Sequence, residues 1–247
     1  MPAGGETGRD APQVAASPDA DNGPRMTDTL EEIADEVRAC RACPLWKTSK
    51  QAVPGEGSGE SGILFLGEAP GFHEDQQGRP FVGAAGQLLD ELLAGIGLDR
   101  SKVFITNVVR HRPPENRDPA PAEIDACDVW LQRHLAALRP RVVVTLGRHA
   151  MGRWLPGESI SRIHGKPRTI DGVTVFPMLH PAAALRSPGL RPAMVADFAS
   201  LAIFLATGPA VTAEEPKPVD QMTLFGRWPT TRSGSSRTAA SARSVRT

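Results

Sequence analysis

The 247-residue sequence lacks the features that mark membrane, secreted and disulfide-rich proteins. No apolar run approaches the ~20 residues that a membrane-spanning helix needs, which argues against an integral membrane protein. The first 25 residues, MPAGGETGRDAPQVAASPDADNGPR, contain no apolar core of a secretory signal, so we expect no export. The chain has only three cysteines, and three cannot all pair. We therefore expect thiols or metal ligands and no disulfide framework.

The sequence also lacks net charge, because 28 Lys and Arg balance 28 Asp and Glu. This balance conceals an uneven distribution. Residues 1–36 carry nine acids and two bases, a net of −7, and residues 226–247 carry five arginines and no acid, a net of +5. The central part, 37–225, is left with a net of +2. A mildly basic central part is compatible with a nucleic-acid partner, which a zero for the whole chain would disfavour.

Composition divides the chain into three parts. We predict a disordered acidic segment over 1–27, one folded domain over 28–207 and a disordered tail over 208–247, which is rich in Pro, Ser, Thr and Arg. A helix is expected to begin near Thr29, because Thr29 and Glu32 have the spacing of a capping box before the apolar Ile33 and Val37.

Four short β-rich runs lie within the predicted domain, and helical patterns separate them. Three apolar helical stripes run over 88–96, 124–138 and 195–205, the last one formed by Val195, Phe198, Leu201, Ala202 and Leu205. Continuous apolar strands that alternate with helices are typical of a parallel sheet covered on both faces. We therefore predict an α/β fold, a three-layer α/β/α arrangement with a four-stranded, mainly parallel sheet. Its strands are Ile63–Leu66, Val103–Val109, Val142–Leu146 and Val173–Met178.

Polar and aromatic residues follow the ends of these strands. In open parallel sheets, ligands bind beyond the carboxyl ends of the strands. Each such residue is also compatible with a turn, a cap or a core position, but together they predict a site at one rim of the sheet. The residues are Gly67 to Gly71, Glu74 and Asp75 after the first strand, Arg79 to Gly83 further on, Asn107, Gly147 and Arg148, and His180 to Arg186.

Four segments resemble the motifs of family 4 uracil-DNA glycosylases, in the family's order and with similar spacing. They are GEAPGFHEDQQGRPFVGAAGQLL, ITNVVRHRPPENRDP, VVVTLGRHA and HPAAALR, and the resemblance covers residues 37–206. It implies an enzyme that flips uracil out of DNA and hydrolyses its N-glycosidic bond, leaving an abasic site for base excision repair. It also implies the uracil-DNA glycosylase fold, a monomer in the bacterial cytoplasm, uracil-containing DNA as partner and no membrane partner.

The resemblance assigns roles to the residues at the rim. Phe81 would stack on the flipped uracil, Asn107 would read its polar edge, and His180 would hydrogen-bond the carbonyl oxygen on which negative charge develops. Glu68 and Asp75 are both candidates for stabilising the positively charged sugar or positioning water, and the choice between them stays open. Leu185 would fill the gap that the flipped base leaves and Arg186 would hold a phosphate, while the pocket would be lined by Gly67, Glu68, Ala69 and Gly71.

The cysteines indicate a metal centre. Cys40 and Cys43 form a C-x-x-C pair, which alone fits a redox pair or half of a zinc site, and Cys127 lies on the helix after the second strand. Family 4 enzymes hold a 4Fe-4S cluster with four cysteines, and His111 stands at the position of one of them. The resemblance therefore implies the ligands Cys40, Cys43, His111 and Cys127, as imidazole can replace thiolate on cluster iron. Structural zinc is the alternative, because a Cys₃His set also suits zinc.

His111 raises a second possibility for the function. The X-type uracil-DNA glycosylases resemble this chain at that histidine, and they trap DNA covalently through a histidine in a KRRIH-like insertion. The alternative function is thus a metal-stabilised protein that binds uracil-DNA or tags it covalently. The corresponding stretch here, VVRHRPPENRDPAPAEIDA, lacks the insertion, and Arg162-Ile163-His164 lies after the third strand instead. We therefore expect turnover and release.

A short motif in the tail suggests a protein partner. Residues 221–225, Gln221-Met222-Thr223-Leu224-Phe225, resemble the Q-x-x-L-F peptide that docks on bacterial sliding clamps. Such peptides must be accessible so that their apolar anchors can enter a pocket. We predict docking through Gln221, Leu224 and Phe225.

Overall fold

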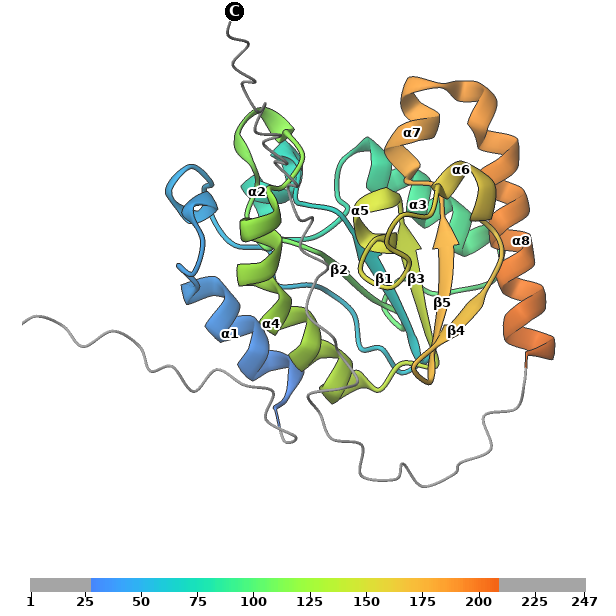
Figure 1. The fold of residues 1–247 in the computed structure, drawn as a ribbon, viewed down its shortest axis with the longest axis horizontal. Helices are drawn as coiled ribbons and strands as arrows, with labels where there is room; N and C mark the ends of the chain where they lie inside the picture. Colours follow the sequence, from blue (N-terminus) through green and yellow to red (C-terminus); the bar gives the residue numbers. More distant parts are fainter. Residues whose placement is uncertain (1–27, 209–247) are drawn as a thin grey trace, which may run out of the picture.

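The computed structural model describes residues 28–208 and contains one five-stranded sheet (Figure 1). The strand order is β2-β1-β3-β5-β4, and all neighbours are parallel except β4 and β5. The predicted disorder of 1–27 and of the tail beyond 208, including the peptide 221–225, concerns residues outside this range and stays a prediction. The strands are β1 Ile63–Gly67, β2 Phe104–Asn107, β3 Val142–Leu146, β4 Arg168–Ile170 and β5 Val173–Met178.

Helices cover both faces of the sheet, which confirms the predicted three-layer architecture. In Figure 1, α1 and α4 lie on one side of the sheet, and α3 and α8 lie on the other. The helices are α1 Leu30–Ala39, α2 Phe72–Gln77, α3 Ala84–Gly95, α4 Pro121–Leu138, α5 Arg148–Met151, α6 Ile160–Ile163, α7 Pro181–Arg186 and α8 Arg191–Thr207, with short 3₁₀ turns η1 Pro44–Lys47, η2 Pro114–Asn116 and η3 Pro188–Leu190.

Alternation along the strands divides the core into two apolar layers. Successive side chains of a strand point to opposite faces. On β1, Ile63 and Phe65 pack in the layer under α3 and α8, whereas Leu64 and Leu66 pack in the layer under α1 and α4. This interior strand is therefore apolar at every position, as its sequence predicted, and the loop that follows Gly67 starts at the rim of the sheet.

Helix α1 begins where the capping box predicted. The Thr29 side chain accepts from the Glu32 N–H at 3.2 Å, and the Glu32 carboxylate accepts from the Thr29 N–H at 2.8 Å. The helix ends at its C-cap, Cys40. The first residue of the C-x-x-C pair is thus placed by the end of a well-capped helix.

The predicted sheet omitted one strand, β4, which has only three residues. It forms an antiparallel hairpin with β5, and Ile170 pairs with Val173 across the two-residue loop Asp171-Gly172. Both loop residues have positive φ, 48° and 78°, as a tight hairpin turn requires. The Asp-Gly pair is a recognised hairpin signal, but the adjacent run 168–170 is too short and too polar to stand out.

Helix α8 differs from the predicted stripe. Phe198 and Leu201 are buried in the core as expected, together with Met194, but Val195 is 52% exposed. The stretch Pro188–Thr207 is also long and apolar enough to cross a membrane, by length and composition only, which corrects the expectation that no apolar run approaches this length. In the structure its Phe198 stacks on Phe65 of β1 at 6.2 Å between ring centroids, so the helix covers the sheet.

Candidate active site

A cavity of about 420 Å³ lies beyond the carboxyl ends of β1, β3 and β5, where the sequence predicted a site. The loop after β1, the β2–α4 connection, the start of α5 and the start of α7 contribute its walls. The lining residues are Glu68, Ala69, Pro70, Gly71, Pro113, Asn116, Arg117, Asp118, Gly147, Arg148, Ile160, Leu179, His180, Ala182, Ala183 and Arg186. Predicted pocket residues therefore occur on three of its walls.

Asn107 and Phe81 lie behind this lining, in contact with Gly67. Asn107 pairs with Gly67 across the β1–β2 ladder. A Cβ placed on Gly67 would approach Asn107 Oδ1 to 2.4 Å and the Phe81 ring to 2.6 Å, so only glycine leaves room for both side chains. Asn107 is 1% exposed, and its Oδ1 has no hydrogen-bond partner among the described residues. A buried amide oxygen without a partner is costly unless a ligand completes it.

His180 caps the N-terminus of α7 and faces Phe81. Its Nδ1 accepts a hydrogen bond from the Ala182 N–H at 3.1 Å, so a neutral ring carries its proton on Nε2. Burial, and secondarily the charge of Arg186, lower the pKa of His180 to about 4. The imidazole ring stacks on Phe81 with 5.6 Å between centroids. His180 is thus a neutral imidazole at physiological pH, with Nε2–H as its donor.

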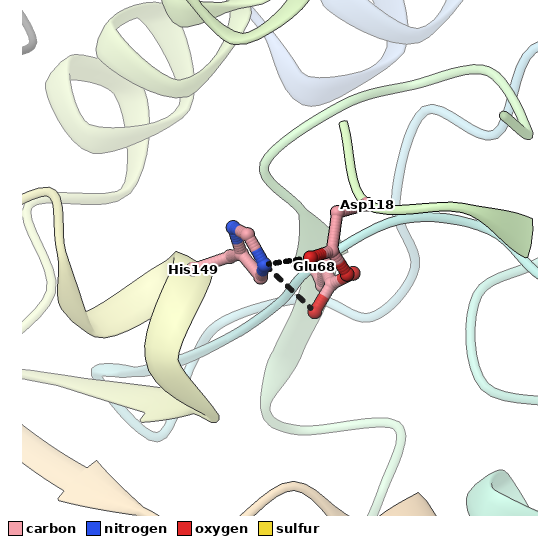
Figure 2. Close-up of side chains that lie close together, drawn as sticks. All are labelled: Glu68, Asp118 and His149. Atoms are coloured by element: carbon pink, nitrogen blue, oxygen red, sulfur yellow. Dashed lines mark ion pairs between the residues drawn. The ribbon is translucent and has the colours of Figure 1, made fainter. Parts of the chain in front are cut away.

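Three side chains lie close together beside the cavity (Figure 2): Glu68 from the loop after β1, Asp118 from the β2–α4 connection and His149 from α5. His149 Nε2 lies 3.8 Å from Glu68 Oε2 and 3.4 Å from Asp118 Oδ2. Their donor atoms all lie within 4.8 Å of one another, as in a metal-ligand group. However, Arg148 hydrogen-bonds to both Asp118 and His149, and its guanidinium already supplies positive charge there.

The surroundings of Glu68 raise the pKa of its carboxyl. Burial is the main cause, and the negative charge of Asp118 acts in the same direction. His149 acts in the opposite direction and lowers this pKa, and Arg148 and Arg186 lower it to a smaller extent. Carboxyls with a perturbed pKa in a cleft are typical of functional sites. Asp118 and His149 were not predicted as partners of Glu68, although both stand within the family-like segments, because they lie 50 and 81 positions after it and nothing in the sequence joins them.

The structure corrects the position of Asp75, which the sequence placed beside Glu68 as a candidate for catalysis. Asp75 is buried outside the cavity lining, and its Oδ1 accepts from the Lys50 N–H at 2.8 Å and the Gln51 N–H at 3.4 Å. Position 75 lies on the side of α2 that packs against the segment after the C-x-x-C pair. Asp75 therefore anchors that segment, and Glu68 is the carboxylate that reaches the cavity.

Glu74 holds together the two loops that carry the site. Its Oε2 accepts from the Gly71 N–H at 3.1 Å, and its Oε1 accepts from the N–H groups of Val82 and Gly83, each at 2.9 Å. These bonds fix the segment after β1 against the segment that bears Phe81, whose φ is +51°. The sequence grouped Glu74 with the other carboxylates at this rim but gave no hint of this supporting role.

The residues predicted to contact DNA lie on α7. Leu185 is 49% exposed, and Arg186 lines the cavity. Arg117 and Arg148 also line it, so guanidinium groups from three segments surround the opening. Such an arrangement suits an anionic polymer.

The predicted metal ligands lie where the end of α1, the segment after β2 and α4 come together. The Cys127 thiol hydrogen-bonds to Cys43, which lowers the pKa of Cys43 to about 7 and raises that of Cys127. Trp130 Nε1 donates to Cys40 Sγ at 3.3 Å. His111 is buried, burial lowers its pKa, and its Nδ1 has no hydrogen-bond partner among the described residues. Three thiols and an unpartnered imidazole nitrogen fit a metal centre.

The spacing of these donors bears on which centre they suit. Tetrahedral zinc with Zn–S bonds of about 2.3 Å brings its ligand atoms to about 3.8 Å from one another. Among residues 28–208, the only three His, Cys, Asp or Glu donors found within 4.8 Å of one another are those of Glu68, Asp118 and His149. No three of the thiols and His111 therefore lie within 4.8 Å of one another, although the thiols of Cys43 and Cys127 are hydrogen-bonded.

A buried guanidinium joins the cysteine region to Asn107. Arg110 is fully buried, and its Nη1 donates to the Asn107 backbone oxygen, while its Nη2 lies 3.3 Å from His134 Nδ1. Burial lowers the pKa of Arg110 to about 10, and the thiols of Cys127 and Cys40 are the main groups that oppose this. A charge buried this deeply needs a counter-charge, which metal-bound thiolates would supply.

His164, the residue that resembles the end of the X-type motif, has a structural partner. Its Nδ1 lies 2.9 Å from both carboxylate oxygens of Asp197 on α8, and it is not among the residues that line the cavity. This arrangement ties the β3–β4 connection to α8.

Known proteins share this sequence over most of its length. The profile of the Uracil DNA glycosylase superfamily matches residues 54–201. The chain is 48% identical over 192 residues to the type-4 uracil-DNA glycosylase of Saccharolobus solfataricus, which covers 74% of this chain and 89% of that protein. It is 48% identical over 183 residues to the type-4 enzyme of Sulfurisphaera tokodaii, covering 69% and 82%, and 47% identical over 180 residues to that of Archaeoglobus fulgidus, covering 69% and 90%.

These relatives agree with the motifs at the strand ends and with the sheet that brings them to one rim. The chain therefore belongs to the uracil-DNA glycosylase superfamily, with the type-4 enzymes.

Proposed function

We propose that this protein excises uracil from DNA by hydrolysing the N-glycosidic bond, leaving an abasic site for base excision repair. The observation that carries the proposal is the convergence of a neutral imidazole donor, an unpartnered buried amide and a carboxylate at one cavity, on His180, Asn107 and Glu68. A flipped base needs recognition of its edge, and its departure needs stabilisation of opposite charges on base and sugar.

His180 supports departure of the base. Its Nε2–H is free to donate to the uracil carbonyl oxygen on which negative charge grows, because Nδ1 is held by the Ala182 N–H. The proton stays on Nε2 throughout, since the pKa of about 4 keeps the ring neutral. A single preorganised donor of this type contributes ~3–4 kcal/mol to lowering the barrier.

Asn107 and Phe81 select the base. The Asn107 amide presents one acceptor and two donors, the pattern that complements the N3–H and the neighbouring carbonyl of uracil. Cytosine reverses this pattern at C4, so the same amide disfavours it. Phe81 supplies the stacking face, and Glu74 holds its loop in place.

Glu68 acts on the sugar side. As a carboxylate at the cavity wall, it favours the oxocarbenium-like sugar and positions the attacking water, and both roles require the ionised form. His149, Arg148 and Arg186 stabilise that form against burial and Asp118. Leu185 and Arg186 then act on the DNA, the first by filling the gap in the stack and the second by holding a phosphate.

Incubation with labelled oligonucleotides tests this function directly. A strand with one uracil should be cut after alkali treatment, and strands with cytosine or thymine at that position should stay intact. No cleavage of the uracil strand would refute the proposal. An adduct with uracil-DNA that survives SDS would instead favour the alternative function, covalent tagging.

We further propose that Cys40, Cys43, His111 and Cys127 hold a 4Fe-4S cluster. Three thiols and the unpartnered His111 imidazole form a donor set that suits a cluster, in which each ligand binds a different iron, and Arg110 supplies a charge that thiolates would balance. When bound, the cluster would cross-link α1, the segment after β2 and α4. Iron and acid-labile sulfide with brown visible absorption are expected, whereas one zinc per chain without sulfide would overturn the assignment.

We propose separately that the protein is a monomer located in the cytoplasm. Docking on a bacterial sliding clamp is a further proposal with a test of its own. Residues Gln221, Leu224 and Phe225 lie outside the described part of the chain. Pull-down of a bacterial sliding clamp by the full chain, lost on Leu224→Ala plus Phe225→Ala, would support docking. No binding by the unaltered chain would refute it.

A further inference from the structure

Phe72 is an aromatic side chain left exposed beside the cavity. Four large apolar side chains are exposed among the described residues. Phe72 is the aromatic one of these four, and it is 53% exposed. It is the first residue of α2 and directly follows Gly71, which lines the cavity. An exposed ring at this place beside the cavity offers a face on which a ligand can stack.

Two neighbours hold the ring in position. The Arg112 guanidinium lies over its face, with 5.2 Å from Cζ to the ring centroid, and the His73 ring meets it edge-on at 5.5 Å. Arg112 is itself fixed, because its Nε donates to Asn116 Oδ1 at 2.7 Å. Asn116 lines the cavity, so Phe72 is tied to the rim through both Gly71 and Arg112. A preorganised ring loses less conformational entropy when a partner stacks on it.

The charge around this ring points to nucleic acid as its partner. Arg112 lies on it, and Arg117, Arg148 and Arg186 line the neighbouring cavity. An exposed aromatic beside a basic groove is how proteins bind the bases of single strands, because every base offers a face for stacking. An apolar protein partner would have to desolvate these guanidinium groups.

We propose that Phe72, positioned by Arg112, is a stacking site for an unpaired nucleobase adjacent to the flipped uracil. The site rests on the proposed function, since a uracil in the cavity brings its neighbour to the rim. A paired neighbour is stacked within the duplex, so the site favours uracil in single strands or at frayed positions. Loss of one such stacking contact lowers binding by about tenfold.

A protein–DNA double-mutant cycle tests the proposal. Wild type and Phe72→Leu, which keeps an apolar side chain without the ring, are assayed on single strands containing one uracil. Three strands are used: all bases present, the 5′ neighbour replaced by a tetrahydrofuran abasic analogue, and the 3′ neighbour replaced likewise. The readout is kcat/KM for uracil release. Phe72→Trp tests rescue by another ring. Val195→Ala, which shortens an exposed apolar side chain on α8, is the matched control.

The kcat/KM of the wild type should fall about tenfold on one of the two analogue strands. Phe72→Leu should show the same loss on the unmodified strand and no further loss on that analogue, while Phe72→Trp and Val195→Ala should behave as wild type. Two results would overturn the stacking site while leaving uracil excision intact. One is that the losses in kcat/KM from Phe72→Leu and from the analogue strand multiply when they are combined. The other is that Phe72→Leu has the wild-type kcat/KM on the unmodified strand. No release by wild type from any strand would contradict the proposed function and, with it, this site.

Discussion

The carboxyl of Glu68 lies between groups that act on its charge in opposite directions. Burial and Asp118 favour the neutral form, whereas His149, Arg148 and Arg186 favour the ionised form. His180 has a pKa of about 4 and stays neutral above that pH. The acidic limb of the pH–rate profile should therefore report the titration of Glu68, with excision lost as pH falls through its raised pKa.

Two isosteric substitutions should move this limb in opposite directions. His149→Gln removes the imidazole that lowers the pKa of Glu68, so this pKa rises further and the limb shifts to higher pH. Asp118→Asn removes a negative charge, so the limb shifts to lower pH. Each shift should be about one pH unit, given the ~1 kcal/mol worth of a charge at this distance even in water. Single-turnover rates between pH 4 and 8 measure it, and equal shifts in one direction would contradict this role of the pair.

Glu74 offers a second test at the scale of one residue. Glu74→Gln weakens three bonds to the N–H groups of Gly71, Val82 and Gly83, so the free energy of unfolding should fall by about 2 kcal/mol. Uracil release should fall as well, because the loop that bears Phe81 loses its support. Urea denaturation and excision rates on the same samples measure both. Glu91→Gln, which breaks an exposed pair with Arg191, is the control and should change stability by less than about 1 kcal/mol.

At the scale of elements, the packing of α1 on α4 positions the cysteines. Arg133 of α4 is almost fully buried and binds Asp28 at 2.5 Å and Glu36 at 2.6 Å, beside and within α1. These bonds hold the end of α1, with Cys40, close to Cys127 on α4. The burial of Arg133 distinguishes this contact from the other ion pairs of α1.

Arg133→Gln should therefore destabilise the protein by about 3 kcal/mol, because it leaves the buried Asp28 carboxylate without its partner. It should also lower the iron retained after purification. Arg38→Gln removes an exposed pair with Asp35 on the same helix and should cost less than about 1 kcal/mol. Urea denaturation and iron content measure both effects; similar losses from the two variants would contradict the role given to Arg133.

Elements with strong local signals were predictable, and those set by distant contacts were not. The continuous apolar run of β1 and the Thr29–Glu32 capping box each determine local structure, and both were confirmed. The three-residue β4 exists because the Asp171-Gly172 turn folds it onto β5, so its own sequence gave little signal. Val195 was assigned to the buried stripe because several residue sets fit a helix this apolar, and only the packing of α8 on the sheet selects one.

The candidate site could also be predicted only in part, because contacts between distant parts of the chain bring some of its residues together. Asn107, His180 and Phe81 follow strands or stand in long motifs, so the sequence and the resemblance identified them. Asp118 and His149 join Glu68 only because two loops and helix α5 converge at one rim (Figure 2). The resemblance offered Asp75, beside Glu68, as a candidate for stabilising the sugar or positioning water, but α2 directs it to the segment at Lys50 instead.

The central claim for the whole molecule is that Asn107 and His180 serve uracil excision at one cavity and do not maintain the fold. The most direct test is the single-turnover rate of uracil release from an oligonucleotide by wild type, Asn107→Ala and His180→Ala, with melting temperatures measured on the same samples. Each variant should lose roughly tenfold or more in rate and melt as wild type does. Release at the wild-type rate by both variants would contradict the claim.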